Sequence, residues 1–85
     1  MMQMAKVRLF GIYSLKATQD EYDIEADDIE EVLLKLSKME PNLNTGELKK
    51  SLIFVNGKSI TELDMFRTKV NSGDNISILS PIAGG

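Results

Sequence analysis

The residues of this sequence that are best placed for chemistry stand at its printed end, in the stretch Ser80-Pro81-Ile82-Ala83-Gly84-Gly85. A carboxylate on Gly85 would be a poor electrophile, because resonance and negative charge oppose attack, so phosphoanhydride chemistry is needed to activate it. Glycine has no side chain and accepts any φ, so Gly84 and Gly85 could enter a narrow channel in another protein. Pro81 stiffens the exit from the preceding strand and lowers the ordering cost of that insertion. Such an ending would suit a carboxylate that has to reach the active site of another protein.

The sequence lacks the side chains on which most active sites depend, since it contains no cysteine and no histidine. The first absence excludes disulfides, thiol nucleophiles and thiolate metal sites, and the second removes the commonest general base and transition-metal ligand. Asp27 and Asp28 are adjacent carboxylates, but they are better explained as the favoured negative start of a helix. We therefore expect no metal site and no catalysis by the chain itself, so that a partner supplies the catalysis.

Length, charge and hydropathy place the chain in a broad class. With 85 residues the sequence predicts a single domain, 1–85, with a flexible C-terminal tail from about residue 80. The formal net charge of -3 argues against a nucleic-acid partner, because such proteins carry a basic stripe. No apolar run is long enough for a signal peptide or a membrane span. We therefore expect a cytoplasmic protein that engages neither nucleic acid nor a membrane.

Hydrophobic periodicity in the first half of the chain predicts a hairpin followed by a helix. Apolar and polar residues alternate from residue 4 onward and continue to Ile12, and they alternate again over 21–27, with the polar connection 14–20 between them. The period then changes, and a helical face is formed by Ile29, Val32, Leu33, Leu36 and Met39. Asp27 or Asp28 can cap this helix, Pro41 marks its end, and residues 42–46 are expected to form a loop.

The second half of the chain predicts further strands. Residues 52–55 are an apolar run followed by Asn56-Gly57, which is the strongest short hairpin signal because both residues tolerate positive φ. Residues 61–70 are irregular and could hold a short strand or a single helical turn, and residues 76–80 form a final strand. Strands on both sides of one helix predict an α+β domain in which the helix covers one face of a single sheet. The opposite face must then meet solvent or a partner.

Several of these segments resemble the ubiquitin-like sulfur carriers, and among them the small subunits of molybdopterin synthase. The resemblance rests on Lys6–Phe10 (KVRLF), Val55–Lys58 (VNGK), Ser72–Leu79 (SGDNISIL) and the ending Ser80–Gly85 (SPIAGG). Relatives carry a Pro-Pro-Val-Ala-Gly-Gly ending, so Ser80 replaces the first proline here and Ile82 replaces the valine. The resemblance covers the whole chain in element order, and its specific motifs lie in the C-terminal third. It implies a β-grasp fold, which is a mixed sheet with one main helix packed on one face.

The resemblance also implies a reaction and its partners. A ubiquitin-activating-type adenylyltransferase with bound ATP would convert the carboxylate of Gly85, next to Gly84, into an acyl-adenylate, and sulfur would displace AMP to leave a thiocarboxylate. The large subunit of molybdopterin synthase would then use that sulfur to build the dithiolene of molybdopterin. The chain would bind no cofactor of its own, since ATP belongs to the activating enzyme. Three alternatives stay open: a ubiquitin-like modifier joined to lysines, a sulfur carrier for another pathway such as thiazole synthesis, and an interaction domain with incidental glycines.

Strand parity suggests the surface that partners would contact. If Phe10, Phe54 and Leu79 face away from the helix, and if their strands are neighbours as in a β-grasp sheet, they form an exposed apolar patch that leads to the tail. Such a patch on a small monomer usually marks an interface. A bulge at Gly11 could reset the parity. The predicted partner-binding residues are Phe10, Phe54, Leu79, Pro81, Ile82 and Ala83.

Overall fold

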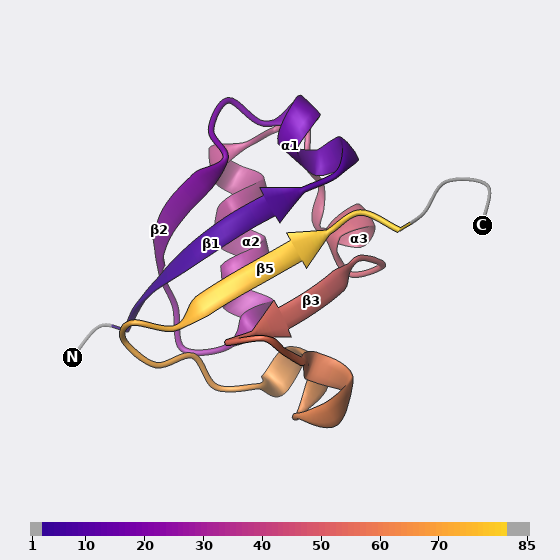
Figure 1. Cartoon of the computed structure of the whole chain (residues 1–85). Coiled ribbons are helices and arrows are strands. Elements are labelled where there is room, and N and C mark those ends of the chain that lie inside the picture. The colour runs from indigo at the N-terminus through magenta and orange to yellow at the C-terminus, as the bar shows by residue number, and fades with distance from the viewer. Residues whose placement is uncertain (1–2, 82–85) are drawn as a thin grey trace.

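The computed structural model describes residues 3–81 and shows one five-stranded sheet with the main helix crossing behind it (Figure 1). The elements in chain order are β1 (Met4–Phe10), α1 (Ile12–Lys16), β2 (Glu21–Glu25), α2 (Ile29–Met39), α3 (Thr45–Leu48), β3 (Leu52–Val55), β4 (Lys58–Ser59), the 3₁₀ turns η1 (Ile60–Glu62) and η2 (Met65–Arg67), and β5 (Asn75–Leu79). The strand order is β2-β1-β5-β3-β4, with β1 parallel to β5 and the other pairs antiparallel. The α+β prediction with a mixed sheet is confirmed.

The core lies between α2 and one face of the sheet. Buried and more exposed residues alternate along β1, β3 and β5, so every second side chain points towards α2. The helix buries Ile29, Val32, Leu33 and Leu36. Met39, which the helical spacing placed on the same face, is 49% exposed, so that prediction is wrong. The inward position in the last turn belongs instead to Glu40, four residues after Leu36.

The start of α2 is capped as the sequence predicts, and the structure chooses between the two candidate residues. Asp28 is the N-cap residue, and its Oδ1 accepts a hydrogen bond from the backbone N–H of Glu31 at 2.9 Å. The Glu31 side chain reaches back and accepts from the backbone N–H of Asp27 at 2.7 Å. These two bonds satisfy donors that have no partner inside the helix.

Two short helices replace segments that the sequence patterns assigned to strand, polar connection or loop. The first strand ends at Phe10 rather than continuing to Ile12, because Gly11 has a φ of 70° and turns the chain into α1. Tyr13 in α1 is then buried, and its hydroxyl donates to the backbone carbonyl of Glu47 at 3.1 Å. In α3, Asn44 caps the helix by accepting from the N–H of Glu47 at 2.8 Å.

The C-terminal half follows the predicted order. Asn56 and Gly57 have φ values of 52° and 85° and form the turn between β3 and β4, which confirms the hairpin. The irregular stretch 61–70 contains short helical turns, one of the two expected outcomes, and β5 runs from Asn75 to Leu79. Within residues 3–81, no helix combines the length and hydropathy that crossing a membrane requires.

Glu40 is a buried carboxylate that joins three segments at the end of α2. It is 3% exposed and accepts hydrogen bonds from the hydroxyl of Thr18 at 2.6 Å, from the backbone N–H of Thr18 at 3.0 Å and from the hydroxyl of Tyr22. These bonds favour the ionised form and hold the pKa of Glu40 below its usual range. Burial, together with the bond to Glu40, raises the pKa of Tyr22. The carboxylate therefore ties α2 to β2 and to the loop after α1.

We predict that Tyr22→Phe lowers the free energy of unfolding by about 1.5–3 kcal/mol near neutral pH, because a hydrogen bond to a charged group is lost. The pKa of Glu40 is lower in the folded chain than in the unfolded one, so its contribution is present above about pH 4.3 and is lost as the pH falls through the folded-state value. The cost of the substitution should therefore shrink in acid. Urea unfolding of both proteins across this pH range measures it.

Tyr13→Phe is the matched control for this experiment. It removes a hydroxyl whose partner is the neutral carbonyl of Glu47, so its cost of about 0.5–1.5 kcal/mol should not vary with acidity around pH 4. An equal, pH-independent loss in both variants would contradict the role assigned to Glu40.

Candidate functional site

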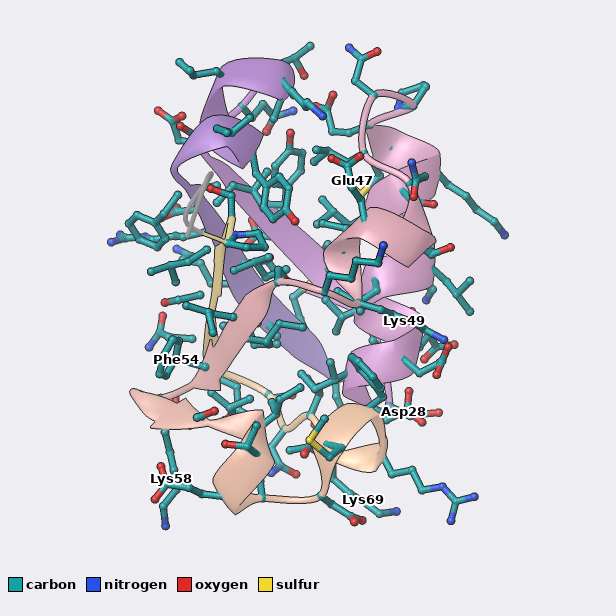
Figure 2. The ribbon with its side chains drawn as sticks, turned by 90° about the vertical axis from the view of Figure 1, so that its right-hand side faces the viewer. Asp28, Glu47, Lys49, Phe54, Lys58 and Lys69 are labelled. Atoms are coloured by element: carbon teal, nitrogen blue, oxygen red, sulfur yellow. The ribbon has the colours of Figure 1, made fainter. Side chains whose placement is uncertain are left out.

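An apolar patch lies at one end of the face of the sheet that is turned away from α2. β1, β5 and β3 are neighbours, and their register sets Phe10 opposite Leu79 and Leu79 opposite Leu52. Phe10 is 43% exposed and Leu52 51% exposed, while Leu79 and Phe54 are half-buried. In Figure 2 Phe54 projects from β3 away from the helices. We call these four residues the outer patch.

The outer patch agrees with strand parity and contains one residue more than the predicted patch. Phe10, Phe54 and Leu79 share the outward face, and Gly11 does not reset the parity because it lies in the turn after β1. Strand parity already sets Leu52 on the outward face together with Phe54, because both alternate with the buried Ile53, but the predicted patch did not include Leu52. Only the register shows that Leu52 is level with Leu79, whereas Phe54 lies opposite Ser77.

Charged residues border the outer patch on the β2 side. The Nε of Arg8 donates to Glu21 at 2.7 Å, and Lys6 lies 3.5 Å from the same carboxylate. The hydrogen bond from Arg8 is the main cause that holds the pKa of Glu21 below its usual range. All three side chains are well exposed, so they contribute little to stability. An apolar centre with a charged rim is the usual composition of a protein-binding surface.

The C-terminal segment, residues 80–85, begins beside the outer patch. The N–H of Ser80 donates to the carbonyl of Phe10 at 3.5 Å, and the hydroxyl of Ser80 accepts from the N–H of Ile12 at 3.1 Å. Pro81 is exposed and borders a cavity of about 250 Å³. The cavity is lined by Ile12, Tyr13, Lys16, Glu47, Lys50, Ser80 and Pro81. Figure 1 shows that the chain leaves the sheet at the end of β5, between α1 and α3.

The predicted reacting residues are not part of this geometry. Gly84 and Gly85, together with the predicted contact residues Ile82 and Ala83, lie outside the described residues. The structure therefore places Phe10, Phe54, Leu79 and Pro81 and leaves the other four as predictions. Within the described part of the chain, no cluster of acidic, cysteine or histidine side chains is arranged to hold a metal ion.

Gly11 makes room for the start of the C-terminal segment. A Cβ atom at this position would lie 2.3 Å from Oγ of Ser80, far inside a van der Waals contact. The φ of 70° is also in the left-handed region that side chains disfavour. Both observations require glycine at the turn between β1 and α1, so that Ser80 can lie against it.

The fold and the outward patch beside the chain end define a class of protein, the ubiquitin-like proteins with a β-grasp fold. The solution structure of small archaeal modifier protein 1 from Methanosarcina acetivorans matches with a TM-score of 0.88 and 28% identity, over 100% of this chain and 99% of that one. A chain of the Helicobacter pylori complex of subunits 1 and 2 of molybdopterin-converting factor matches with a TM-score of 0.67 and 28% identity, over 98% and 100%. These likenesses confirm the β-grasp prediction.

The sequence comparisons name the family. Residues 7–85 match the model of the ThiS family, so the chain belongs to that family of ubiquitin-like sulfur carriers. A relative from Archaeoglobus fulgidus, named "Putative sulfur carrier protein", is 32% identical over 62 residues. That match covers 73% of this chain and spans 61% of the relative's length. The resemblance found in the sequence motifs is therefore confirmed at the level of the family.

We predict that Gly11→Ala destabilises the fold more than Gly57→Ala, a substitution at another glycine with positive φ. Gly57 has a φ of 85° and no atom within 4 Å of the position that a Cβ would take, so Gly57→Ala should cost about 1–2 kcal/mol through backbone strain alone. Gly11→Ala should cost about 1 kcal/mol more, because Ser80 must move and the bond from Ile12 is lost. Thermal and urea unfolding compare the two, and equal losses would contradict the contact.

Proposed function

We propose that this protein is a sulfur carrier whose terminal Gly85 is converted to a thiocarboxylate, and that it donates sulfur for molybdopterin synthesis as the small subunit of the synthase. The single observation that carries the proposal is the outer patch, which lies at the same end of the sheet as the start of the C-terminal segment. A partner that covers the patch can therefore receive the segment in its own active site. The cytoplasm is the expected location.

The comparisons support the class and favour the pathway. Membership of the ThiS family supports a sulfur carrier. The Helicobacter pylori relative is described in a complex with a second subunit, which supports a protein partner of comparable kind here, the large subunit of a molybdopterin synthase. A relative structure, the Amycolatopsis orientalis BexX/CysO complex, has a TM-score of 0.80 and 16% identity over 95% of this chain and 99% of that one, so it supports the fold alone.

The chemistry requires two steps, both performed on Gly85 by other proteins. An adenylyltransferase of the ubiquitin-activating type transfers AMP from ATP to the carboxylate and releases pyrophosphate, which makes the carbonyl carbon electrophilic. A sulfur nucleophile then attacks that carbon and AMP leaves, so that the carboxylate becomes a thiocarboxylate. The chain contributes a narrow diglycine end and a docking surface, and it needs neither a catalytic side chain nor a bound cofactor.

We predict that incubation with the cognate activating enzyme, ATP and a sulfur donor raises the intact mass by the difference between one sulfur and one oxygen atom. Mass spectrometry of the whole protein measures the change, and fragmentation should place it on Gly85. Deletion of Gly85 should abolish the gain while unfolding curves stay unchanged. A full-length protein that shows no mass change with an enzyme proven active on another carrier would refute the proposed chemistry.

We predict that Leu52→Ala weakens binding to the synthase large subunit about tenfold, because truncating an anchor at the centre of an apolar interface typically costs about 1–2 kcal/mol. Leu34→Ala is the matched control, since Leu34 is 46% exposed but lies on α2, which covers the opposite face of the sheet. Calorimetry of both variants measures the dissociation constants. Equal affinities would show that the outer patch is not the docking surface.

One alternative has a specific observation in its favour. The relative from Methanosarcina acetivorans is named a small archaeal modifier protein and matches this chain over its whole length. If this chain is a modifier that is joined to lysines of other proteins, conjugates in which Gly85 forms an isopeptide bond with a lysine side chain should be recovered from cells. Their recovery without any thiocarboxylate form would favour the modifier over the sulfur carrier.

A further inference from the structure

Ser80 makes two hydrogen bonds to the turn that follows β1. Its backbone N–H donates to the carbonyl of Phe10 at 3.5 Å, which extends the parallel pairing of β1 and β5 by one residue. Its hydroxyl accepts from the backbone N–H of Ile12 at 3.1 Å. That N–H belongs to the first residue of α1 and has no partner inside the helix. A single side-chain oxygen therefore joins the end of β5 to the start of α1.

We propose that Ser80 is a positioning residue that sets the direction in which the C-terminal segment leaves the domain. The enzymatic part of this inference rests on the function proposed above. The hydroxyl of Ser80 holds the chain against Gly11, and Pro81 follows with its own φ restricted by the ring. The backbone is therefore restricted at both Ser80 and Pro81, which line the cavity of about 250 Å³ next to α1.

The glycine at position 11 supports this assignment independently. Oγ of Ser80 occupies the space that any side chain at residue 11 would need, since a Cβ there would lie 2.3 Å away. The other described turn glycines with positive φ, Gly57 and Gly73, have no atom within 4 Å of that position. Among these three turns, the close approach is specific to the one that receives Ser80.

The same contacts couple the segment to the docking surface. Phe10 contributes its side chain to the outer patch and its carbonyl to the bond from Ser80. The patch and the start of the segment are therefore held in one relative orientation before any partner binds. Orientation that exists before binding lowers the ordering cost of association, so the loss of the hydroxyl should appear as weaker binding and not as slower chemistry.

The test is Ser80→Ala, which removes only the hydroxyl. With the activating enzyme, KM for the carrier should rise about three- to tenfold while kcat stays unchanged, as expected for one lost hydrogen bond of pre-organisation. In the free protein, the residual dipolar coupling of the Cα–Hα bond of Pro81 should shrink towards zero relative to the wild type. The second measurement needs no enzyme, so it tests the positioning role even if the proposed function fails.

Ser72→Ala is the control, because it also removes a hydrogen-bonded hydroxyl but lies in the turn before the N-terminal end of β5. The hydroxyl of Ser72 donates to the side chain of Gln3 at 2.9 Å. The control substitution should leave both KM and the coupling at Pro81 unchanged. The inference is overturned if Ser80→Ala keeps the wild-type coupling, or if KM is unchanged with a wild-type protein that is adenylated. A wild-type protein that is never adenylated, with a coupling that still depends on Ser80, overturns the proposed function alone.

Discussion

Parallel pairing of β1 with β5 is the constraint on which the rest of the structure depends. Parallel strands cannot be joined by a tight turn, so the chain between them must cross over one face of the sheet. That crossover contains α2, which supplies the apolar face of the core. Because the two strands run in the same direction, their C-terminal ends lie at the same end of the sheet. Phe10 and Leu79 are therefore paired there.

The two faces of the sheet consequently have different tasks. On one face, the inward residues of the central strands pack against α2. At the C-terminal end of α2, Glu40 accepts hydrogen bonds from Thr18 and Tyr22. On the other face no described element covers the sheet, so Phe10 and Leu52 remain exposed. A small domain has too little chain to cover both faces, and the uncovered one is available to a protein partner.

The proposed chemistry does not require an enzyme-like site among the described residues. The reacting group of a carrier is activated in another protein, so the domain needs a recognisable surface and a well-placed exit for its C-terminal segment. Both needs are met at the same edge, where Ser80 bonds to the turn at Gly11 and Ile12. Under the proposed function, the folded domain would provide the docking surface and the exit point, and partner proteins would modify the C-terminal residue.

Local patterns determined most of the elements. Three features could be predicted because each depends on neighbours within a few residues. The helical period and its capping aspartate predict α2, and Asn56-Gly57 predicts the β3–β4 hairpin. The alternation of apolar and polar residues predicts that Phe10 faces outward. The motifs of the C-terminal third pointed to the family.

The tertiary structure alone decided what depends on contacts between distant residues. It set Glu40 rather than Met39 inward, where Thr18 and Tyr22 supply its hydrogen bonds, and it requires a glycine at position 11 because Ser80, 69 positions later, occupies the space of a side chain. No short window of sequence contains both partners of such a contact, so the register of Leu52 beside Leu79 and the position of Ser80 could be known only from the fold.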